Sequence, residues 1–359
     1  MGSSPMTLPQ RAELDIPIED IDDGLMQQAQ RRLDQLTKPL GSLGRLEAVA
    51  KQIVGITRTM RPRLADKVII TMAADHGVVA EGVSAYPQAV TEQMVYNFLR
   101  GGAGINVLAR HVGARVVVVD MGVAADLAPH PQLVQRKTRR GTANMAAGPA
   151  MTREDARAAM QIGMELVGGE ITRGAELIGT GDMGIGNTTA SSAIAAVLTG
   201  SPVSQVTGRG TGIDDATYAK KVAVIQRALD VNRPDPADPL DVLAKVGGFE
   251  IAGLVGVMLG GAQAHRPVVI DGFISGAAAL IAVALNPRAR SYLIASHRSQ
   301  EPGHRVMLDS LNLQPLLDLD LRLGEGTGAA LAMSVIEAVC KILTEMATFE
   351  EAGVARRAG

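Results

Sequence analysis

Four short runs of aliphatic residues, each followed by a glycine-bearing loop, constrain the fold of this chain most strongly. They lie in KVIITMAADHG (67–77), ARVVVVDMGV (114–123), AELIGTGDMGIGNTT (175–189) and RPVVIDGFISG (266–276). A helix-like stretch comes after each loop. Strands that are covered on both faces by crossover helices have this continuous Val/Ile pattern. The pattern therefore predicts an α/β protein with a mostly parallel sheet flanked by helices.

Polar residues follow these runs where the predicted strands end. Asp75 and His76 follow the first run, Asp120 ends the second, and Asp271 follows the fourth. In open parallel sheets, ligands bind beyond the carboxyl ends of the strands. We therefore expect the functional site at that edge of the sheet.

Both ends of the chain are predicted to be helical. Apolar residues recur at three- and four-residue spacing over 19–60, and a helical pattern returns from about residue 303. We expect a large α/β domain over 36–302 that carries the phosphate and base sites. The two ends, 1–35 and 303–359, are expected to form a small helical domain.

The overall charge argues against polyanionic partners. The formal net charge is −2 at pH 7, so no global field attracts nucleic acid or an anionic membrane. Local basic spots such as Arg136–Arg140 are more typical of solvated loop. The apolar runs 273–285 and 326–336 are shorter than the roughly 20 residues of a membrane-spanning helix. The first ten residues lack the pattern of an export signal. These features favour a cytoplasmic protein.

The single cysteine, Cys340, lies in an apolar helical run, so an intramolecular disulfide is excluded. A small buried hydrophobic residue is a better interpretation of Cys340 than a nucleophile. No GxSxG motif accompanies it, which disfavours nucleophilic hydrolysis.

The third aliphatic run continues into a turn that is suited to binding an anion. Four glycines between 179 and 186 let backbone N–H groups face a ligand, and Asn187 and Thr188 then open a helix. Amide donors, hydroxyls and a helix N-terminus together can hold a phosphate. The alternative is an ordinary helix-capping turn. The segment is not a Walker A loop, because no Gly-Lys-Ser/Thr follows.

A second glycine-rich segment, TGRGTGIDDATYAKK, covers 207–221. Gly208 and Gly210 could approach a ligand closely, and Lys220 could reach a phosphate as a point charge. A lone lysine on a helix is more often solvated surface. As a dinucleotide fingerprint the segment is weak, because no clear strand precedes it.

Histidine-bearing segments support other functions less well. Asp75 and His76 are adjacent, but the other five histidines are scattered without metal-ligand spacing, so no metal site is expected. Tyr86 could line a ring pocket or could simply pack in its loop. The segment SHRSQEPGHR (296–305) could be an active-site loop, although a surface turn is favoured.

Glu325 lies between two glycines in RLGEGTGAALAM (322–333), at the start of an apolar helical run. One interpretation is an acid that the positive end of the helix dipole favours. The other is a general base on a bare loop that a ligand can approach closely.

Six motifs occur in one order between about residues 20 and 345, and together they indicate a family. They are KPLGSLGRLE (38–47), AADHGV (73–78), GDMGIGNTTAS (181–191), KVGGFEIAGLVGVMLG (245–260), DGFISGAAAL (271–280) and RLGEGTGAALAM (322–333). In these motifs the chain resembles the nicotinate-nucleotide–dimethylbenzimidazole phosphoribosyltransferase family. The resemblance implies a Rossmann-like sheet, a small helical domain from both chain ends, a homodimer whose neighbouring subunit helps close the site, and no cofactor or metal.

The resemblance also implies a reaction and its residues. The 5-phosphoribosyl group of nicotinate mononucleotide would pass to 5,6-dimethylbenzimidazole, giving α-ribazole 5′-phosphate and nicotinate for the cobalamin lower ligand. Glu325 would be the general base, and Asp182, where relatives often have Glu, a second catalytic carboxylate. The base pocket would comprise Tyr86, Met94 and Leu323. Phosphate and ribose would contact Gly184, Gly186, Asn187, Thr188, Gly208, Gly210 and Lys220.

The chemistry is consistent with a single carboxylate. Nicotinate leaves from a cationic pyridinium, so cleavage of its glycosidic bond needs neither a general acid nor a metal. The attacking benzimidazole becomes acidic at its other N–H, and one base can take that proton. Two alternatives remain: an enzyme that uses phosphoribosyl pyrophosphate and Mg²⁺, and a regulatory module that binds a nucleotide without reaction. Which lower-ligand base is preferred also stays open.

Overall fold

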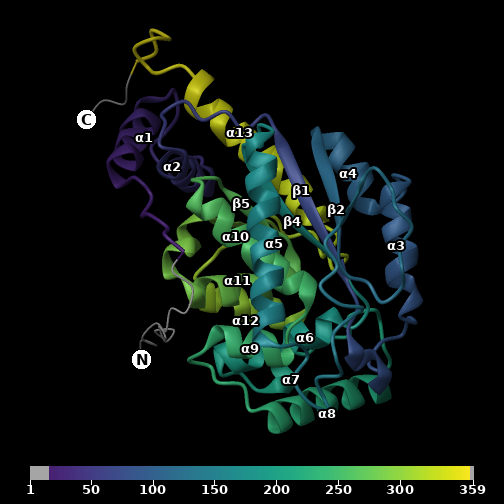
Figure 1. The fold of residues 1–359 in the computed structure, drawn as a ribbon. Coiled ribbons are helices and arrows are strands. Elements are labelled where there is room, and N and C mark those ends of the chain that lie inside the picture. The colour runs from purple at the N-terminus through teal and green to yellow at the C-terminus, as the bar shows by residue number, and fades with distance from the viewer. Residues whose placement is uncertain (1–15, 356–359) are drawn as a thin grey trace, which may run out of the picture.

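The computed structural model describes residues 16–355, and within that range the chain forms a six-stranded sheet in the order β3-β2-β1-β4-β5-β6. Every pairing between neighbouring strands is parallel. The predicted α/β class with a parallel sheet is therefore confirmed (Figure 1). The strands are β1 (Lys67–Ala74), β2 (Ala114–Gly122), β3 (Leu133–Gln135), β4 (Leu177–Met183), β5 (Val268–Ile270) and β6 (Leu293–Ala295).

Strand β1 lies at the centre of the sheet, and all eight of its residues are buried. Side chains alternate between the two faces, because successive residues of a strand point in opposite directions. Ile69 and Ala73 belong to one hydrophobic cluster, and Ile70 and Met72 to the other. Both faces of the sheet are thus covered, which explains why the strand sequences lack an apolar/polar alternation.

Helices form a layer on each face of the sheet. One layer packs around α5 (Arg153–Thr172), α10 (Phe249–Gln263) and α11 (Gly272–Leu285), and the other around α13 (Thr327–Glu345). The first layer also contains α6 (Asn187–Thr199), α7 (Val203–Val206), α8 (Asp215–Asn232), α9 (Pro239–Val246), α12 (Pro302–Leu311) and the 3-10 turn η2 (Pro287–Tyr292). The second includes α1 (Asp23–Gln35), α2 (Arg45–Thr57), α3 (Ala89–Leu99) and α4 (Gly104–Val112), and the 3-10 turn η1 (Gly77–Glu81) follows β1.

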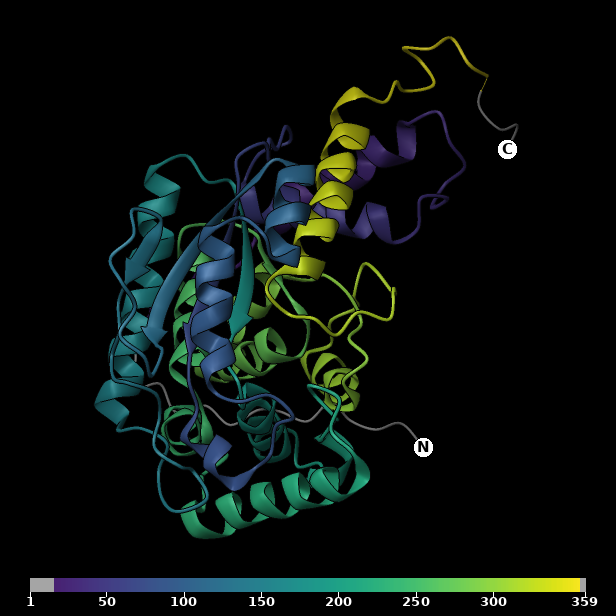
Figure 2. The same cartoon turned by 90° about the vertical axis from the view of Figure 1, so that its right-hand side faces the viewer.

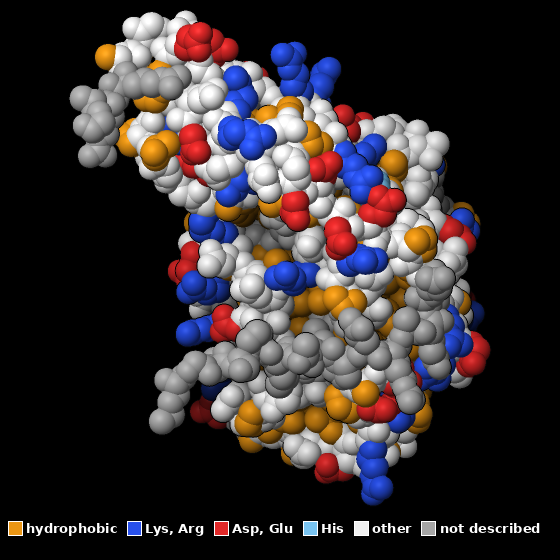
Figure 3. Space-filling model, turned by 90° about the vertical axis from the view of Figure 1, so that its left-hand side faces the viewer, with side chains coloured by type: hydrophobic (Ala, Val, Ile, Leu, Met, Phe, Trp, Pro, Cys, Tyr) orange, Lys and Arg blue, Asp and Glu red, His pale blue; other side chains and the backbone are white. Residues whose placement is uncertain are grey.

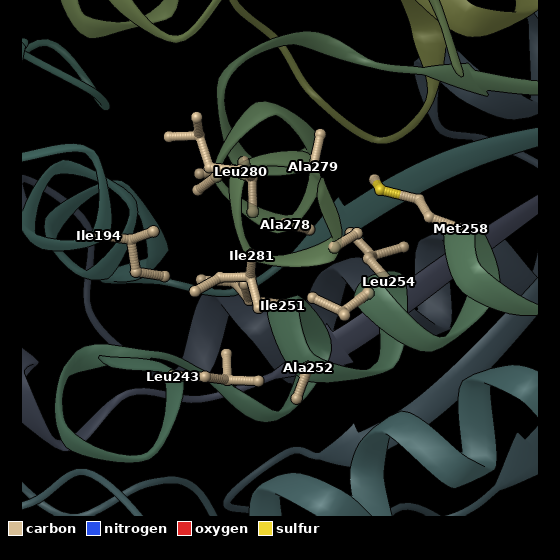
Figure 4. Close-up of a cluster of buried hydrophobic side chains, with 14 of the residues drawn as sticks. Ile194, Leu243, Ile251, Ala252, Leu254, Met258, Ala278, Ala279, Leu280 and Ile281 are labelled. Carbon is tan, nitrogen blue, oxygen red and sulfur yellow. The ribbon is translucent and has the colours of Figure 1, made fainter. Parts of the chain in front are cut away.

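The first layer contains a core built from aliphatic side chains. Ile194, Leu243, Ile251 and Leu280, from four different helices, lie together in it (Figure 4). Helix α10 approaches α5 so closely that a Cβ on Gly256 would lie 1.9 Å from a backbone oxygen of α5. The abundance of glycine and small aliphatic residues in the sequence is thus used in close helix packing.

The helices near the two ends of the described chain lie side by side. Helices α1 and α2 pack against each other and against α13 (Figure 2). The Arg32 guanidinium also donates a 2.7 Å hydrogen bond to the Leu343 carbonyl at the end of α13. Helix α12 packs on α11 and α6 instead. The domain boundaries at residues 35/36 and 302/303 stay a prediction.

Helix α13 is longer than the apolar run expected from the sequence. Within residues 16–355 it is the one helix whose length and composition would suffice to cross a membrane: it has 19 residues and a mean hydropathy of 1.5. That hydropathy belongs to an 18-residue stretch of the helix, 56% of which is buried inside the protein, and core helices of soluble proteins meet the same criterion. Cys340 lies within it as a buried residue, and burial raises its thiol pKa to about 12.

The surface matches the near-neutral net charge. Figure 3 shows Lys/Arg and Asp/Glu side chains interspersed on one face of the molecule. The N-terminal segment on which the export-signal prediction rests, residues 1–10, lies outside the described residues.

Candidate active site

A cavity of about 540 Å³ opens beyond the carboxyl ends of the central strands, at the expected edge of the sheet. The strands in Figure 2 point toward this end of the molecule, where α8 lies. The cavity draws on segments that are far apart in the sequence. Its lining includes Tyr86, Met94, Asp182, Gly184, Gly186, Asn187, Thr188, Gly210, Gly272, His297, Ser299, Glu301, Arg322, Leu323 and Glu325.

Most of the residues predicted from the sequence meet in this cavity. They are Glu325, Asp182, Tyr86, Met94, Leu323, Gly184, Gly186, Asn187, Thr188 and Gly210. The roles assigned to these residues stay predictions. The cavity nevertheless brings together a carboxylate, apolar side chains and a glycine turn. Such a combination of apolar lining with a few convergent polar groups is typical of a ligand site.

Two predicted residues, Gly208 and Lys220, do not line the cavity. Gly208 lines an adjoining hollow, where a Cβ would lie 1.8 Å from a carboxylate oxygen of Glu301. Lys220 is exposed on α8, and its ammonium lies beside Gly82. The helical periodicity of α8 turns Lys220 away from the site.

The neighbouring lysine, Lys221, does not line the cavity either, but it contacts Thr188, which does. It is 1% exposed, and its ammonium donates a 2.7 Å hydrogen bond to the Thr188 hydroxyl. Burial lowers the Lys221 pKa to about 8, and the nearby Glu301 carboxylate opposes that shift. Its position could have been inferred from the sequence, because Lys221 precedes the buried Val224, Ile225 and Ala228 at helical spacing.

The glycine turn between β4 and α6 is not capped by a side chain of Asn187 or Thr188. The N-cap of α6 is Gly186, whose φ of 97° lies in the left-handed region that favours glycine. The Asn187 amide instead donates a 3.0 Å hydrogen bond to Asp182. In the first turn of α6 the Asn187 and Thr189 amides donate hydrogen bonds to the Gly184 and Gly186 carbonyls. Anion binding at this turn would therefore rest on the positive end of the helix as a whole, and it stays a prediction.

Glu325 is held against a helix other than the one it precedes. Its carboxylate accepts a 3.0 Å hydrogen bond from the Ile105 amide, at the N-terminus of α4. One interpretation of the sequence was that the dipole of the following helix, α13, stabilises the Glu325 carboxylate. In the structure the N-terminus that contacts this carboxylate belongs to α4. Burial raises the pKa of Glu325, while hydrogen bonds from the Ile105 and Gly104 amides act in the opposite direction.

Asp182 is the next-to-last residue of β4, lies near Glu325 and is almost completely buried. Burial, followed by the negative charge of Asp271, holds the pKa of Asp182 well above its usual range. One carboxylate oxygen has no hydrogen-bond partner among residues 16–355. A protonated Asp182 would offer a hydrogen-bond donor to a ligand.

His76 lies against a carboxylate that is far from it in the sequence. The imidazole of His76 lies 2.6 Å from the Glu250 carboxylate, and both side chains are buried. In the part of the chain that the structure describes, no group of three or more His, Cys, Asp or Glu side chains is arranged to hold a metal ion.

The segment 296–305 is not the surface turn that was favoured. His297, Ser299 and Glu301 are buried and line the cavity, because the segment continues from β6 at the carboxyl edge of the sheet. Burial lowers the pKa of His297 to about 4, so its imidazole is neutral at physiological pH. Glu301 accepts a 2.9 Å hydrogen bond from the Gly210 amide and so ties the second glycine loop to this segment.

A second hollow of about 610 Å³ lies beside α5 and α9, away from these residues. Arg139, Arg153 and Lys245 line it, and each pairs with an aspartate. None of the predicted site residues lies there.

The chain is similar to known proteins over almost its whole length. A family model described as "Phosphoribosyltransferase" matches residues 18–354. A nicotinate-nucleotide–dimethylbenzimidazole phosphoribosyltransferase of Chloroflexus aggregans is 61% identical over 340 residues, which is 95% of this chain and 96% of that relative. The one from Geobacter metallireducens is 62% identical over 337 residues, 94% of this chain and 96% of the relative. Among solved structures, CobT from Thermus thermophilus superposes with a TM-score of 0.90 at 51% identity, covering 93% of this chain and all of that one.

Proposed function

Because the chain belongs to the nicotinate-nucleotide–dimethylbenzimidazole phosphoribosyltransferase family, we propose that it makes α-ribazole 5′-phosphate for the lower ligand of cobalamin. It would transfer the 5-phosphoribosyl group of nicotinate mononucleotide to 5,6-dimethylbenzimidazole and release nicotinate. The observation that supports this most directly is one cavity that is lined by both Glu325 and the glycine turn between β4 and α6.

The reaction needs one base. The bond between C1′ and the pyridinium nitrogen breaks, and its electron pair neutralises the nitrogen of the leaving nicotinate. One benzimidazole nitrogen bonds to C1′ from the opposite face, which turns a β-nucleotide into an α-nucleotide. The proton on the other ring nitrogen then passes to Glu325. Holding both substrates in one cavity supplies much of the acceleration.

The environment of Glu325 suits a general base. Its raised pKa brings it closer to the operating pH, where proton transfer is most efficient. The amides at the start of α4 still favour its ionised form. Asp182, whose pKa is raised further, would instead orient the ribose or the base as a neutral donor.

The phosphate would bind at the glycine turn. Gly184, Gly186 and the first residues of α6 provide amides, and Lys221 provides a buried positive charge beside Thr188. In this proposal Lys221 replaces Lys220. Arg322, which donates a 3.0 Å hydrogen bond to the Gly210 carbonyl, joins the second glycine loop to the segment that carries Glu325.

The heteroaromatic base would lie at the apolar end of the cavity. Tyr86 and Leu323 line that end and are 53% and 59% exposed, so the cavity is open on this side. An open apolar end is consistent with the homodimer implied by the family, in which a second copy of the chain would close the site.

A mass-spectrometric assay tests the function. Nicotinate mononucleotide and dimethylbenzimidazole, incubated with the protein in the presence of EDTA, should yield α-ribazole 5′-phosphate and nicotinate. A strict requirement for Mg²⁺ and phosphoribosyl pyrophosphate would instead identify a different phosphoribosyltransferase. Absence of any product at saturating substrate would favour a nucleotide-binding module. A panel of bases in the same assay identifies the preferred acceptor.

A further inference from the structure

The peptide between Glu325 and Gly326 is hydrogen-bonded on both sides by the sheet. The Thr71 hydroxyl donates a 3.0 Å hydrogen bond to the Glu325 carbonyl. The Gly326 amide donates a 2.9 Å hydrogen bond to the Asp271 carboxylate. Thr71 and Asp271 are both completely buried. Buried hydrogen bonds of this kind are costly to lose, because the group left behind has no water to pair with.

The strands themselves place these two side chains. Thr71 lies in β1, directly opposite Gly181 of the paired strand β4, and Asp271 follows β5. A Cβ on Gly181 would lie 2.3 Å from the Glu325 carbonyl oxygen. The carbonyl therefore rests against the backbone of β4 at a point where only glycine leaves room for it.

The conformation of Glu325 depends on this support. Its φ of 64° lies in the left-handed region, which is unfavourable for a residue with a side chain, and Gly324 and Gly326 on either side have positive φ as well. A strained backbone of this kind persists only where the surrounding structure determines it. The same conformation directs the Glu325 carboxylate to the Ile105 amide.

Neither Thr71 nor Asp271 lines the cavity. Any influence they have on the reaction must therefore pass through another group. Asp271 has a second function, because its other oxygen accepts a 3.1 Å hydrogen bond from Ala329 and so anchors α13. Within the described residues, the Thr71 hydroxyl donates its one hydrogen bond to the Glu325 carbonyl. A substitution of Thr71 therefore removes this contact without also releasing α13, as a substitution of Asp271 would.

We propose that Thr71, together with Asp271, is a positioning residue that fixes the Glu325–Gly326 peptide and so aims the Glu325 carboxylate at the substrate. This inference rests on the proposed function of Glu325 as the general base. Displacement of a catalytic group by about 1 Å can slow an enzyme by about 100-fold. The clamp formed by Thr71 and Asp271 thus acts on turnover and not on the affinity for the phosphoribosyl donor.

The test compares Thr71→Val, which removes the hydroxyl and keeps the side-chain shape, with Thr71→Ser, which keeps the hydroxyl. Thr71→Val should lower kcat about tenfold while KM for nicotinate mononucleotide changes by less than about twofold. Thr71→Ser should recover most of the lost kcat. Thr344→Val is the matched control. It also removes a threonine hydroxyl, which donates a 2.9 Å hydrogen bond to the Cys340 carbonyl near the far end of α13. Its kcat should equal that of the unmodified protein.

A double-mutant cycle shows whether Thr71 acts through Glu325. In a Glu325→Gln background, Thr71→Val should cause no further loss of kcat, because the group that it positions is already absent. A folded Thr71→Val protein with unchanged kcat would overturn the proposal. So would an undiminished loss in the Glu325→Gln background.

A second variant covers the case in which Thr71→Val does not fold, as judged by its thermal unfolding. Gly181→Ala then takes its place, because the new methyl group would displace the Glu325 carbonyl. We expect Gly181→Ala to lower kcat while KM for nicotinate mononucleotide stays nearly unchanged. A folded Gly181→Ala protein with unchanged kcat would count against the clamp. The proposed function fails separately, if the unmodified protein makes no product or if Glu325→Gln keeps full activity.

Discussion

Glu325 and Asp182 are both buried carboxyl groups on one cavity, yet their surroundings suit them to different tasks. Burial raises the pKa of each, but Asp182 also faces the negative charges of Asp271, Glu250 and Glu325. Glu325 gains two backbone amides from α4, whereas Asp182 gains one side-chain amide. Environments that separate two carboxyl pKa values are typical of a base paired with a neutral donor.

Replacing Glu325 by Gln tests the general base directly. We expect kcat to fall about 100-fold or more, because the amide cannot accept the benzimidazole proton. KM for nicotinate mononucleotide should change little, because the phosphate contacts remain. Steady-state kinetics with the mass-spectrometric assay measure both values. Glu345→Gln, an exposed change on the same helix, is the control, and equal rates in both variants would show that Glu325 has only a structural role.

The pH dependence of turnover should report the raised pKa of Glu325. A base acts only when ionised, so kcat should fall as pH decreases through that pKa, at a pH above the ordinary glutamate value of 4.5. The groups that bear on this titration are Asp182 at the end of β4, Asp271 after β5 and the amides of α4. A kcat profile between pH 4 and 9 checks the prediction. An acid limb at or below pH 4.5 would contradict it.

At the scale of secondary-structure elements, helix periodicity decides which lysine reaches the site. One residue along α8 rotates a side chain by about 100° around the axis. That step separates the exposed Lys220 from the buried Lys221, which meets Thr188 at the start of α6. The glycine motif indicates the segment, and the helical spacing of Lys221 from Val224 and Ile225 indicates the buried face of α8. The structure adds that this lysine contacts Thr188.

Lys221→Met and Lys220→Met form a matched pair on α8. Loss of a charged contact to phosphate should raise KM for nicotinate mononucleotide about tenfold or more in Lys221→Met. Lys220→Met should change KM by less than about twofold. In the unmodified protein KM should rise as pH increases through the Lys221 pKa of about 8, because the ammonium is lost. Similar KM values for the two variants would contradict this assignment.

At the scale of the whole molecule, the parallel sheet gathers several buried acids at one edge, and this should affect stability. The pKa values of Asp182 and Asp271, the latter raised to about 7, exceed those of an unfolded chain. At a pH between the ordinary aspartate pKa and these raised values, Asp182 and Asp271 hold more protons in the folded protein than in the unfolded chain. The contribution of these two acids to stability should therefore decrease as pH rises from about 4 to 7. His297 and His304, whose pKa values burial lowers to about 4 and about 3, contribute in the opposite direction.

Asp182→Asn removes one of these groups. Relative to the unmodified protein, the slope of the free energy of unfolding against pH should then be more positive, by up to about 1.4 kcal/mol per pH unit for one proton. Urea unfolding at several pH values between 4 and 7.5 measures the slope. Asp309→Asn, an exposed change, should leave it unaltered. Equal slopes for the Asp182 variant and the unmodified protein would show that Asp182 does not titrate in this range.

The assembly is a further property of the whole molecule. A homodimer should elute with a mass about twice the 37.4 kDa of the chain in size-exclusion chromatography with light scattering. Dimerisation would cover exposed apolar side chains such as Tyr86 and Leu323. A monomer at assay concentration that still turns over would contradict the role proposed for the second copy.

Much of the fold and part of the site could be predicted from local sequence. The aliphatic runs ending near Ala74, Gly122, Met183 and Ile270 correspond to β1, β2, β4 and β5, because doubly covered strands must be apolar throughout. Strands β3 and β6 were not predicted, although β5 is equally short. The β5 run leads directly into a glycine-bearing loop, whereas no glycine follows β3 or β6 as closely. The motif around Glu325 and the glycine turn identified the cavity, because close backbone approach requires glycine there.

Tertiary structure alone decided how the site is supported. The sequence by itself determined the α/β class, the family and most of the residues that line the cavity. It did not show that Glu325 would contact α4, that Thr71 and Asp271 would hydrogen-bond its peptide, or that Lys221 would contact Thr188. These contacts join residues far apart in the chain, and parallel strand register and helix packing bring them together. Local composition cannot specify such pairs, because each partner has an ordinary structural role when its segment is considered alone.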